Sequence, residues 1–157
     1  MGSAAHAPRR RLAAAVLVAA VCATGASVSN AATQAHFRSP SGSINCYLFA
    51  ADGGAADCLV RDASWRHLPA KPAACDLDWS PTEVQLGRTA VSVGQCRGDV
   101  GPRCYSGGGA CTLLAYGRSI TIGTIRCSSA ATGITCRRTT GRRPGFRVAR
   151  EAVVVFR

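Results

Sequence analysis

The chain has 157 residues, 47% of them hydrophobic, nine cysteines and a formal net charge of +11. A length of this order favours one domain with a short additional segment. After residue 23 no stretch is long and apolar enough for a transmembrane helix, so a helical membrane protein is not expected.

Residues 1–31 are predicted to form a secretory signal peptide. Arg9–Arg11 supply the positive charge, and the apolar run Leu12–Ala23 is too short to span a bilayer. Ser29-Asn30-Ala31 fits the small-x-small pattern of a cleavage site. Two other sites fit the same pattern and remain open: Thr24-Gly25-Ala26 and Thr33-Gln34-Ala35.

Cys22 lies inside this predicted leader and is interpreted as a small apolar residue of its hydrophobic segment. Lipid attachment would call for Gly, Ala or Ser before the cysteine, where the chain has Val21. Cleavage after Ala31 leaves residues 32–157, which are predicted to be a single secreted β domain without a membrane span. The expected location is extracellular.

The mature part shows the period-two alternation of β-strands. Ile134 and Cys136 alternate with polar neighbours, as Phe146 and Val148 do. Further apolar positions at strand spacing flank Gly87-Arg88, which predicts a hairpin, and 120–127 is consistent with one strand that carries a bulge at Gly123-Thr124. Residues 152–156 predict a terminal strand buried on both faces.

Helix signals are scarce. Ser80-Pro81 followed by Glu83 resembles a capped first turn, so Ser80–Leu86 is the best helix candidate, with one or two turns at most. Glycine-rich turns are frequent along the rest of the mature chain. Short strands with frequent turns predict an all-β fold, a small disulfide-stapled sandwich or barrel of short antiparallel strands with little helix.

Several segments carry a resemblance to a known family. In chain order they are Phe37–Cys46 (FRSPSGSINC), Cys75–Trp79, Cys96–Asp99, Tyr116-Gly117, Gly133–Cys136 and Gly145–Arg150. In this order they resemble a family of small secreted, disulfide-containing proteins of high-GC Gram-positive bacteria with a domain of unknown function. The resemblance covers Phe37–Phe156. It implies export, one domain and disulfides, but no activity.

The chain departs from that family pattern at several positions. Ser43 stands where the family has Asn, Ser80 stands where it has Gly, and the His of its Thr-Gly-His-Gly-Phe segment is absent from 140–146. Cys104 and Cys111 are an addition to the family set. A role that depends on the missing His is therefore not expected here.

Eight cysteines follow the leader, and an even set in a short exported chain predicts a disulfide framework. Sequence does not select one of the roughly one hundred possible connectivities. The simplest hypothesis is local pairing of neighbours along the chain, since turns lie between several of them. This scheme joins Cys46 to Cys58, Cys75 to Cys96, Cys104 to Cys111 and Cys127 to Cys136.

No motif predicts catalysis, a metal site or a cofactor. The chain has no C-x-x-C pair, H-E-x-x-H helix, G-x-S-x-G segment or nucleotide-binding loop. His36 and His67 lie in no recognisable constellation. Asp76 and Asp78 are spaced for one face of a strand, yet the adjacent Cys75 favours a structural turn. An enzyme is not expected.

The positive charge is concentrated at the C-terminal end. Residues 32–125 are nearly balanced, whereas residues 126–157 contain eight arginines against Glu151 alone. Four of these arginines are candidates for binding an anion, since guanidinium groups grip phosphate or carboxylate with paired hydrogen bonds. They are Arg137, Arg138, Arg142 and Arg143. The alternative is a solvated basic edge that keeps a β domain soluble and unpaired.

Two functions follow as hypotheses. The first is an extracellular binding module for anionic envelope polymers, such as wall polymers or lipid headgroups; nucleic acid is not expected, because no aromatic residues interleave the arginines. The second is a disulfide-stapled inhibitor or effector of another secreted protein, acting through the loop Tyr105–Ala110 between Cys104 and Cys111.

Overall fold

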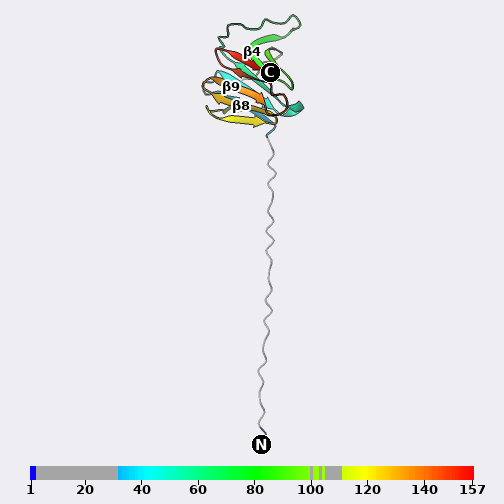
Figure 1. The fold of residues 1–157 in the computed structure, drawn as a ribbon, viewed down its shortest axis with the longest axis vertical. Coiled ribbons are helices and arrows are strands. Elements are labelled where there is room, and N and C mark those ends of the chain that lie inside the picture. The colour runs from blue at the N-terminus through cyan, green and yellow to red at the C-terminus, as the bar shows by residue number, and fades with distance from the viewer. Residues whose placement is uncertain (3–31, 100, 103, 105–110) are drawn as a thin grey trace.

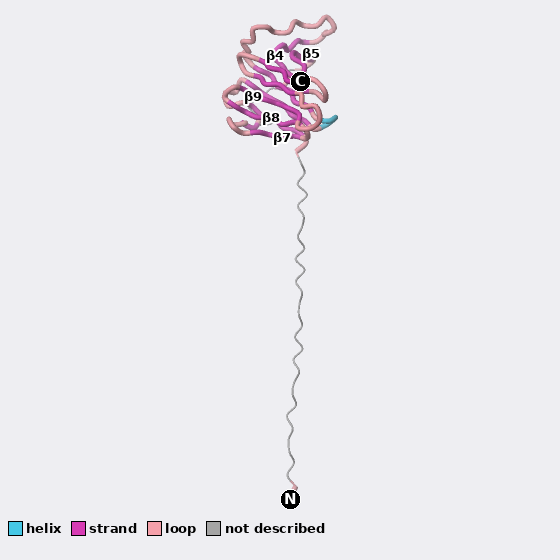
Figure 2. Tube along the Cα trace, viewed as in Figure 1, coloured by secondary structure: helices cyan, strands magenta, loops and turns pink. Residues whose placement is uncertain are grey.

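The computed structural model describes residues 1–2, 32–99, 101–102, 104 and 111–157. Most of the predicted leader, with Cys22 and the cleavage sites before residue 32, lies outside the described residues, as does Tyr105–Ala110. The described chain is almost entirely strand and loop, with one short 3-10 turn, η1 (Ala51–Gly53) (Figure 2). Among these residues no helix is long and apolar enough to cross a membrane.

The described chain contains eleven strands that form two sheets. The N-terminal sheet holds six strands, which Figure 1 draws from cyan to green and into yellow, and the C-terminal sheet holds five, drawn from yellow to red. The strands are β1 (Gln34–Arg38), β2 (Ile44–Phe49), β3 (Ala55–Val60), β4 (Asp78–Leu86), β5 (Val91–Arg97), β6 (Thr112–Leu113), β7 (Ser119–Ile122), β8 (Ile125–Ala130), β9 (Gly133–Arg138), β10 (Gly145–Val148) and β11 (Val153–Phe156).

The two sheets differ in topology. The C-terminal sheet is a simple antiparallel meander in the order β11-β10-β9-β8-β7, and the N-terminal sheet has the order β5-β4-β3-β2-β1-β6. In the N-terminal sheet β6 pairs with β1 in parallel, so the chain crosses from the β5 edge to the opposite edge before it forms β6. The described residues of this connection (98–99, 101–102, 104 and 111) are called the strap below.

The core lies between the sheets and confirms the predicted all-β, sandwich-like fold. Strands such as β8 and β9 turn alternate side chains inward, as the period-two pattern predicts. The largest fully buried apolar side chains come from both sheets, with Phe37 and Leu48 on one side and Ile134 and Phe146 on the other. Trp65 joins this core from the loop between β3 and β4 and donates its ring N–H to the carbonyl oxygen of Ala149 at 2.9 Å.

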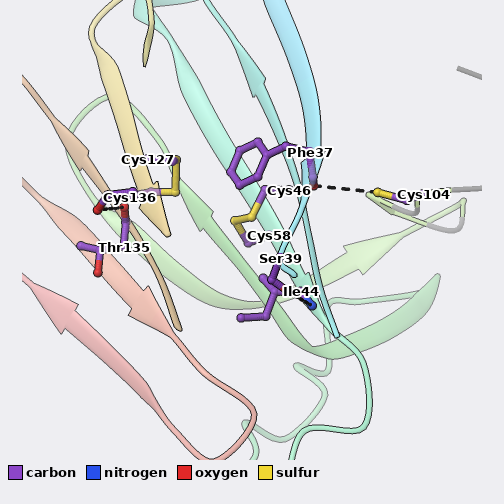
Figure 3. The surroundings of a disulfide bond; sticks show 10 residues. Phe37, Ser39, Ile44, Cys46, Cys58, Cys104, Cys127, Thr135 and Cys136 are labelled. Carbon is purple, nitrogen blue, oxygen red and sulfur yellow. Dashed lines mark hydrogen bonds between the residues drawn. A yellow bond between two sulfur atoms is a disulfide. The ribbon is translucent and has the colours of Figure 1, made fainter. Parts of the chain in front are cut away.

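Four disulfides staple the described chain, and they join the neighbouring pairs of the local scheme. Two of them link directly opposite residues of hairpins: Cys46–Cys58 joins β2 to β3, and Cys127–Cys136 joins β8 to β9. All four of these cysteines are buried in the interlayer core (Figure 3). The other two pairs, Cys75–Cys96 and Cys104–Cys111, lie in loops or at strand ends.

The predicted helix at Ser80–Leu86 is wrong, because this segment belongs to β4. Its register with β5 shifts between Ser80 and Val84, which creates a bulge. Pro81 lies in this bulge, where its missing N–H removes no ladder hydrogen bond. Gly94 faces the bulge with φ +82°, and a Cβ there would clash with the ring of Trp79.

Two further expectations about strands are corrected. Gly123-Thr124 is not a bulge within one strand but the two-residue turn between β7 and β8, and Gly123 has the positive φ that such a hairpin turn uses. The last strand is not buried on both faces. It is the edge of the C-terminal sheet, with Val154 and Val155 36% and 41% exposed.

Candidate functional site

Three arginines share the outer face of the C-terminal sheet. Arg126 of β8 and Arg137 of β9 are directly opposite each other, and Arg147 of β10 lies diagonally across from Arg137. Opposite and diagonal neighbours in a sheet have Cβ atoms about 5–8 Å apart. The three side chains are exposed, and we call them the basic face.

Glycine and phenylalanine hold one of these arginines in place. Arg137 is opposite Gly145, and Gly145 is opposite Phe156 on the edge strand. Since Gly145 has no side chain, Arg137 extends across it, and its guanidinium carbon lies 3.9 Å from the centre of the Phe156 ring. This cation–π contact orients the guanidinium before any ligand arrives.

The strands that form the basic face carry no acidic side chain. The five strands of the C-terminal sheet contain no Asp or Glu, and none of the three arginines forms an ion pair with any described residue. Arg126 donates instead to the hydroxyl of Ser119 at 3.0 Å. Like charges opposite each other in a sheet are unfavourable, and an anion bound between them would relieve that repulsion.

The structure divides the four arginines that the sequence proposed as an anion site. Arg137 belongs to the basic face, and Arg142 and Arg143 are exposed in the connection between β9 and β10. Arg138 does not belong with them. It is only 7% exposed and turns inward, so we correct its assignment as an anion-binding residue.

The Arg138 guanidinium is saturated by the protein itself. It donates to the backbone carbonyl oxygens of Gly53, Gly54 and Gly87 at 2.6–3.1 Å. A further hydrogen bond of 2.9 Å goes to the hydroxyl of Thr124. These partners occupy all five N–H groups of the side chain. Arg138 therefore ties the turns of the two sheets together and has no donor left for a ligand.

A second charged cluster lies under the strap and was not predicted. Asp57 of β3 and Glu83 of β4 are on the outer face of the N-terminal sheet, yet their side chains are 6% and 1% exposed. Arg97 at the end of β5 pairs with both carboxylates, and its Nε donates to Glu83 at 2.8 Å. One oxygen of each carboxylate has no hydrogen-bond partner among the described residues.

The cluster changes the acidity of its members. Burial, together with the hydrogen bond and negative charge of Glu83, outweighs the lowering effect of Arg97 and raises the pKa of Asp57 to about 8. Asp57 therefore holds its proton at neutral pH. Burial alone would lower the pKa of Arg97, but the hydrogen bond to Glu83 and the charge of Asp57 raise it.

The remaining sequence candidates do not assemble into a site. His67 and Asp76 are exposed in the long connection between β3 and β4, and His36 packs edge-on against Tyr47 with ring centres 4.1 Å apart. Asp78 is exposed at the start of β4. The described residues contain no group of His, Cys, Asp and Glu side chains arranged to hold a metal ion.

The basic face also contains residues that sequence analysis missed. Arg126 and Arg147 were counted in the C-terminal charge but not singled out. A signal was present, because each lies between two residues that face the core: Ile125 and Cys127 in β8, and Phe146 and Val148 in β10. Alternation therefore places both arginines on the outer face.

Comparison with known proteins reports one match. Residues 14–156 match the model of a family of unknown function, DUF6636. The chain belongs to this family. No curated protein and no solved structure matches the chain. The family description assigns no activity.

Proposed function

We propose that the protein is a secreted binding module whose basic face holds anionic polymers of the cell envelope. The observation that carries the proposal is the alignment of Arg126, Arg137 and Arg147 on one exposed sheet face without a carboxylate among them. Arg142 and Arg143 extend the positive charge beyond the end of β9. The four disulfides suit an oxidising environment outside the cell.

The shape of the surface favours a chain-like ligand. Adjacent strands repeat every 4.8 Å or so, and the arginines occupy three neighbouring strands of the sheet. Such a row presents guanidinium groups at regular intervals to the repeating phosphates or carboxylates of a polymer. Hydroxyl groups of Ser128 and Thr135, on the same face, can bond to the sugar or alcohol units between the charges.

The test is binding of purified polyglycerol phosphate to the protein at about 50 mM and about 300 mM NaCl, measured by calorimetry. We expect binding to weaken at the higher salt concentration, because exposed charges are screened over a Debye length near 10 Å at 0.1 M. The triple variant Arg126→Ser, Arg137→Ser, Arg147→Ser should bind at least about tenfold more weakly, since three charge-assisted contacts are lost.

A matched control removes three arginines from elsewhere. Arg61, Arg66 and Arg88 are exposed and lie in connections of the N-terminal sheet. Their replacement by serine changes the net charge by the same amount and should leave binding within about twofold. If both triple variants lost the same affinity for the polymer, the net charge of the protein alone would explain binding. Undiminished binding by the Arg126/Arg137/Arg147 variant would refute the proposal.

A further inference from the structure

The end of the sandwich opposite Arg138 contains a cavity of about 200 Å³. Four connections meet around it: the β1–β2 turn, the segment before β7, the β8–β9 turn and the β10–β11 turn. We call it the serine cavity. Its polar and aromatic lining residues are Ser39, Ser41, Ser43, Tyr116, Arg150 and Glu151.

The three serines form a chain of hydroxyl groups. Ser39 and Ser41 are joined by an Oγ–Oγ contact of 3.0 Å, and Ser41 and Ser43 by one of 2.8 Å. The turn that brings them together uses Gly42 with φ +72°, and the N–H of Ile44 donates to the Ser39 hydroxyl at 3.2 Å. Either oxygen of each contact can be the donor, so the hydrogen bonds of the chain can point in either direction. The chain can therefore offer a ligand a hydrogen-bond donor or an acceptor.

The charged groups at the rim are of opposite sign. Arg150 and Glu151 are neighbours in the β10–β11 turn, both are exposed, and neither forms an ion pair with a described residue. An anion in the cavity would face Glu151 and a cation would face Arg150. The pair therefore favours a neutral ligand that both accepts and donates hydrogen bonds.

An aromatic ring completes the lining. Tyr116 is 52% exposed, which is a large exposed fraction for an aromatic side chain that lines a cavity. A sugar ring has an apolar C–H face that can pack on such a ring, and hydroxyl groups at its edge that match serine, arginine and carboxylate partners. The volume is below that of pockets for drug-sized ligands and suits a single ring.

Backbone hydrogen bonds fix the walls of the cavity in advance. The N–H of Ser64 donates to the carbonyl oxygen of Arg150 at 2.8 Å, and the N–H of Gly117 donates to Ser129 at 2.8 Å. Gly133 has φ +119°, and a Cβ there would clash with the backbone of Val148. Walls held by such contacts lose little conformational entropy when a ligand binds.

We propose that the serine cavity binds one neutral monosaccharide unit, separately from the basic face. Three features of the lining carry the proposal: the chain of serine hydroxyls, the exposed ring of Tyr116, and the side chains of Arg150 and Glu151, which form no ion pair with a described residue. This site does not depend on the proposed polymer binding. It would allow the protein to recognise the end of a glycan, or a sugar substituent, whatever the charge of the rest of the polymer.

The test is titration of the ¹⁵N-labelled protein with glucose, galactose, mannose and N-acetylglucosamine, each to about 50 mM, monitored by two-dimensional NMR. At least one sugar should bind with a dissociation constant on the order of 1–10 mM, a range that suits a single small ring. The amide shifts should map to the rim of the cavity: Ser41, Gly42, Tyr116, Gly133 and Arg150. Raising the salt concentration should leave the affinity unchanged.

Two exposed residues provide variants that keep the fold intact. Tyr116→Ala and Glu151→Gln together should weaken sugar binding at least about fivefold, because a packing contact and an acceptor are lost. Thr89→Ala, which removes a hydroxyl from the exposed β4–β5 turn at the other end of the sandwich, is the control and should bind as the wild type does. The triple variant of the basic face should also bind the sugar normally, which separates the two proposals.

The proposal is overturned if none of the four sugars shifts amides at the rim of the serine cavity. It is equally overturned if the shifts map to the basic face, or if the Tyr116→Ala, Glu151→Gln variant binds as tightly as the wild type.

Discussion

Two arginines of this protein are held inside polar clusters, and the clusters differ in the charge of the groups that accept hydrogen bonds from the guanidinium. Arg138 is surrounded by neutral acceptors, namely three backbone carbonyl groups and one hydroxyl. Arg97 is paired with two buried carboxylates, Asp57 and Glu83. The Arg138 cluster satisfies every donor of the side chain, whereas the Arg97 cluster leaves two carboxylate oxygens without described partners.

The difference determines how each cluster responds to pH. Backbone carbonyls and hydroxyls do not titrate in the physiological range, so the contribution of Arg138 should be constant. The Arg97 cluster contains a carboxyl group whose pKa is raised to about 8 by burial and by Glu83. The neutral acceptors of Arg138 thus give a link between the two sheets that does not depend on pH. The Arg97 cluster links β3, β4 and β5 within one sheet, and its strength depends on protonation.

Replacing Arg138 should have the largest effect. In Arg138→Met, the carbonyl oxygens of Gly53, Gly54 and Gly87 lose their donors at a buried position. We expect the free energy of unfolding to fall by about 3–5 kcal/mol, by analogy with the loss of one partner of a buried charged cluster. Urea denaturation measures this. Arg137→Met, the outward-facing neighbour, should change it by less than about 0.5 kcal/mol; equal losses would contradict the comparison.

The pH dependence of stability should be the next largest effect. The folded protein keeps the Asp57 proton up to pH about 8, whereas the unfolded chain, with a pKa of 3.8, has released it. The free energy of unfolding should therefore fall between about pH 4 and pH 8, with a slope of at most about 1.4 kcal/mol per pH unit. Thermal unfolding at intervals across this range measures the slope.

Asp57→Asn sharpens this test. The amide resembles the protonated carboxyl, so the variant should lose the slope and become more stable than the wild type above pH 8. Asp76→Asn, at an exposed position, should keep the slope. A variant at Asp57 that unfolds with unchanged pH dependence would show that another group is responsible.

Removing Arg97 should cost less than removing Arg138, because Arg97 is partly exposed and Asp57 can remain protonated. Arg97→Met should lower the free energy of unfolding by about 2 kcal/mol at pH 5 and by more at pH 9, where Asp57 of the wild type is ionised and attracts Arg97 more strongly. Chemical denaturation at both values measures the difference. A loss that is the same at pH 5 and pH 9 would exclude the electrostatic explanation.

The smallest effect should come from the strap that covers the carboxylates. Gly101 has φ +60°, and a Cβ there would lie 2.8 Å from Oε2 of Glu83. Gly101→Ala should lower stability by about 1 kcal/mol through backbone strain and displacement of the strap. Gly98→Ala is the control, since its nearest neighbour would be Leu77 at an ordinary 3.7 Å. Equal melting temperatures for the two variants would contradict this account.

The sequence predicted the regular parts of the fold well. Alternation at Ile134–Cys136 and Phe146–Val148 identified β9 and β10, and the turns between neighbouring cysteines favoured the local pairs that the structure contains. The same alternation would have placed Arg138 inside, since it has the parity of Ile134 and Cys136. Its charge and its arginine neighbours suggested a surface position instead.

The buried carboxylates could not have been predicted in the same way. Asp57 and Glu83 have the parity of outward-facing residues, and alternation correctly places them on the outer face of the N-terminal sheet. Part of the cover on Glu83 comes from Gly101, in the connection between β5 and the distant strand β6. A crossing between distant strands depends on tertiary topology, which leaves no periodic signal in the sequence.

The order of the disulfides along the chain has a consequence for how they can form. Each pair is complete before the first cysteine of the next pair begins, and no pair encloses another or overlaps it. A polypeptide that enters an oxidising compartment with its N-terminus leading would therefore meet one correct partner at a time. Native connectivity then requires no reshuffling, and the kinetics of translocation alone can direct each thiol to its partner.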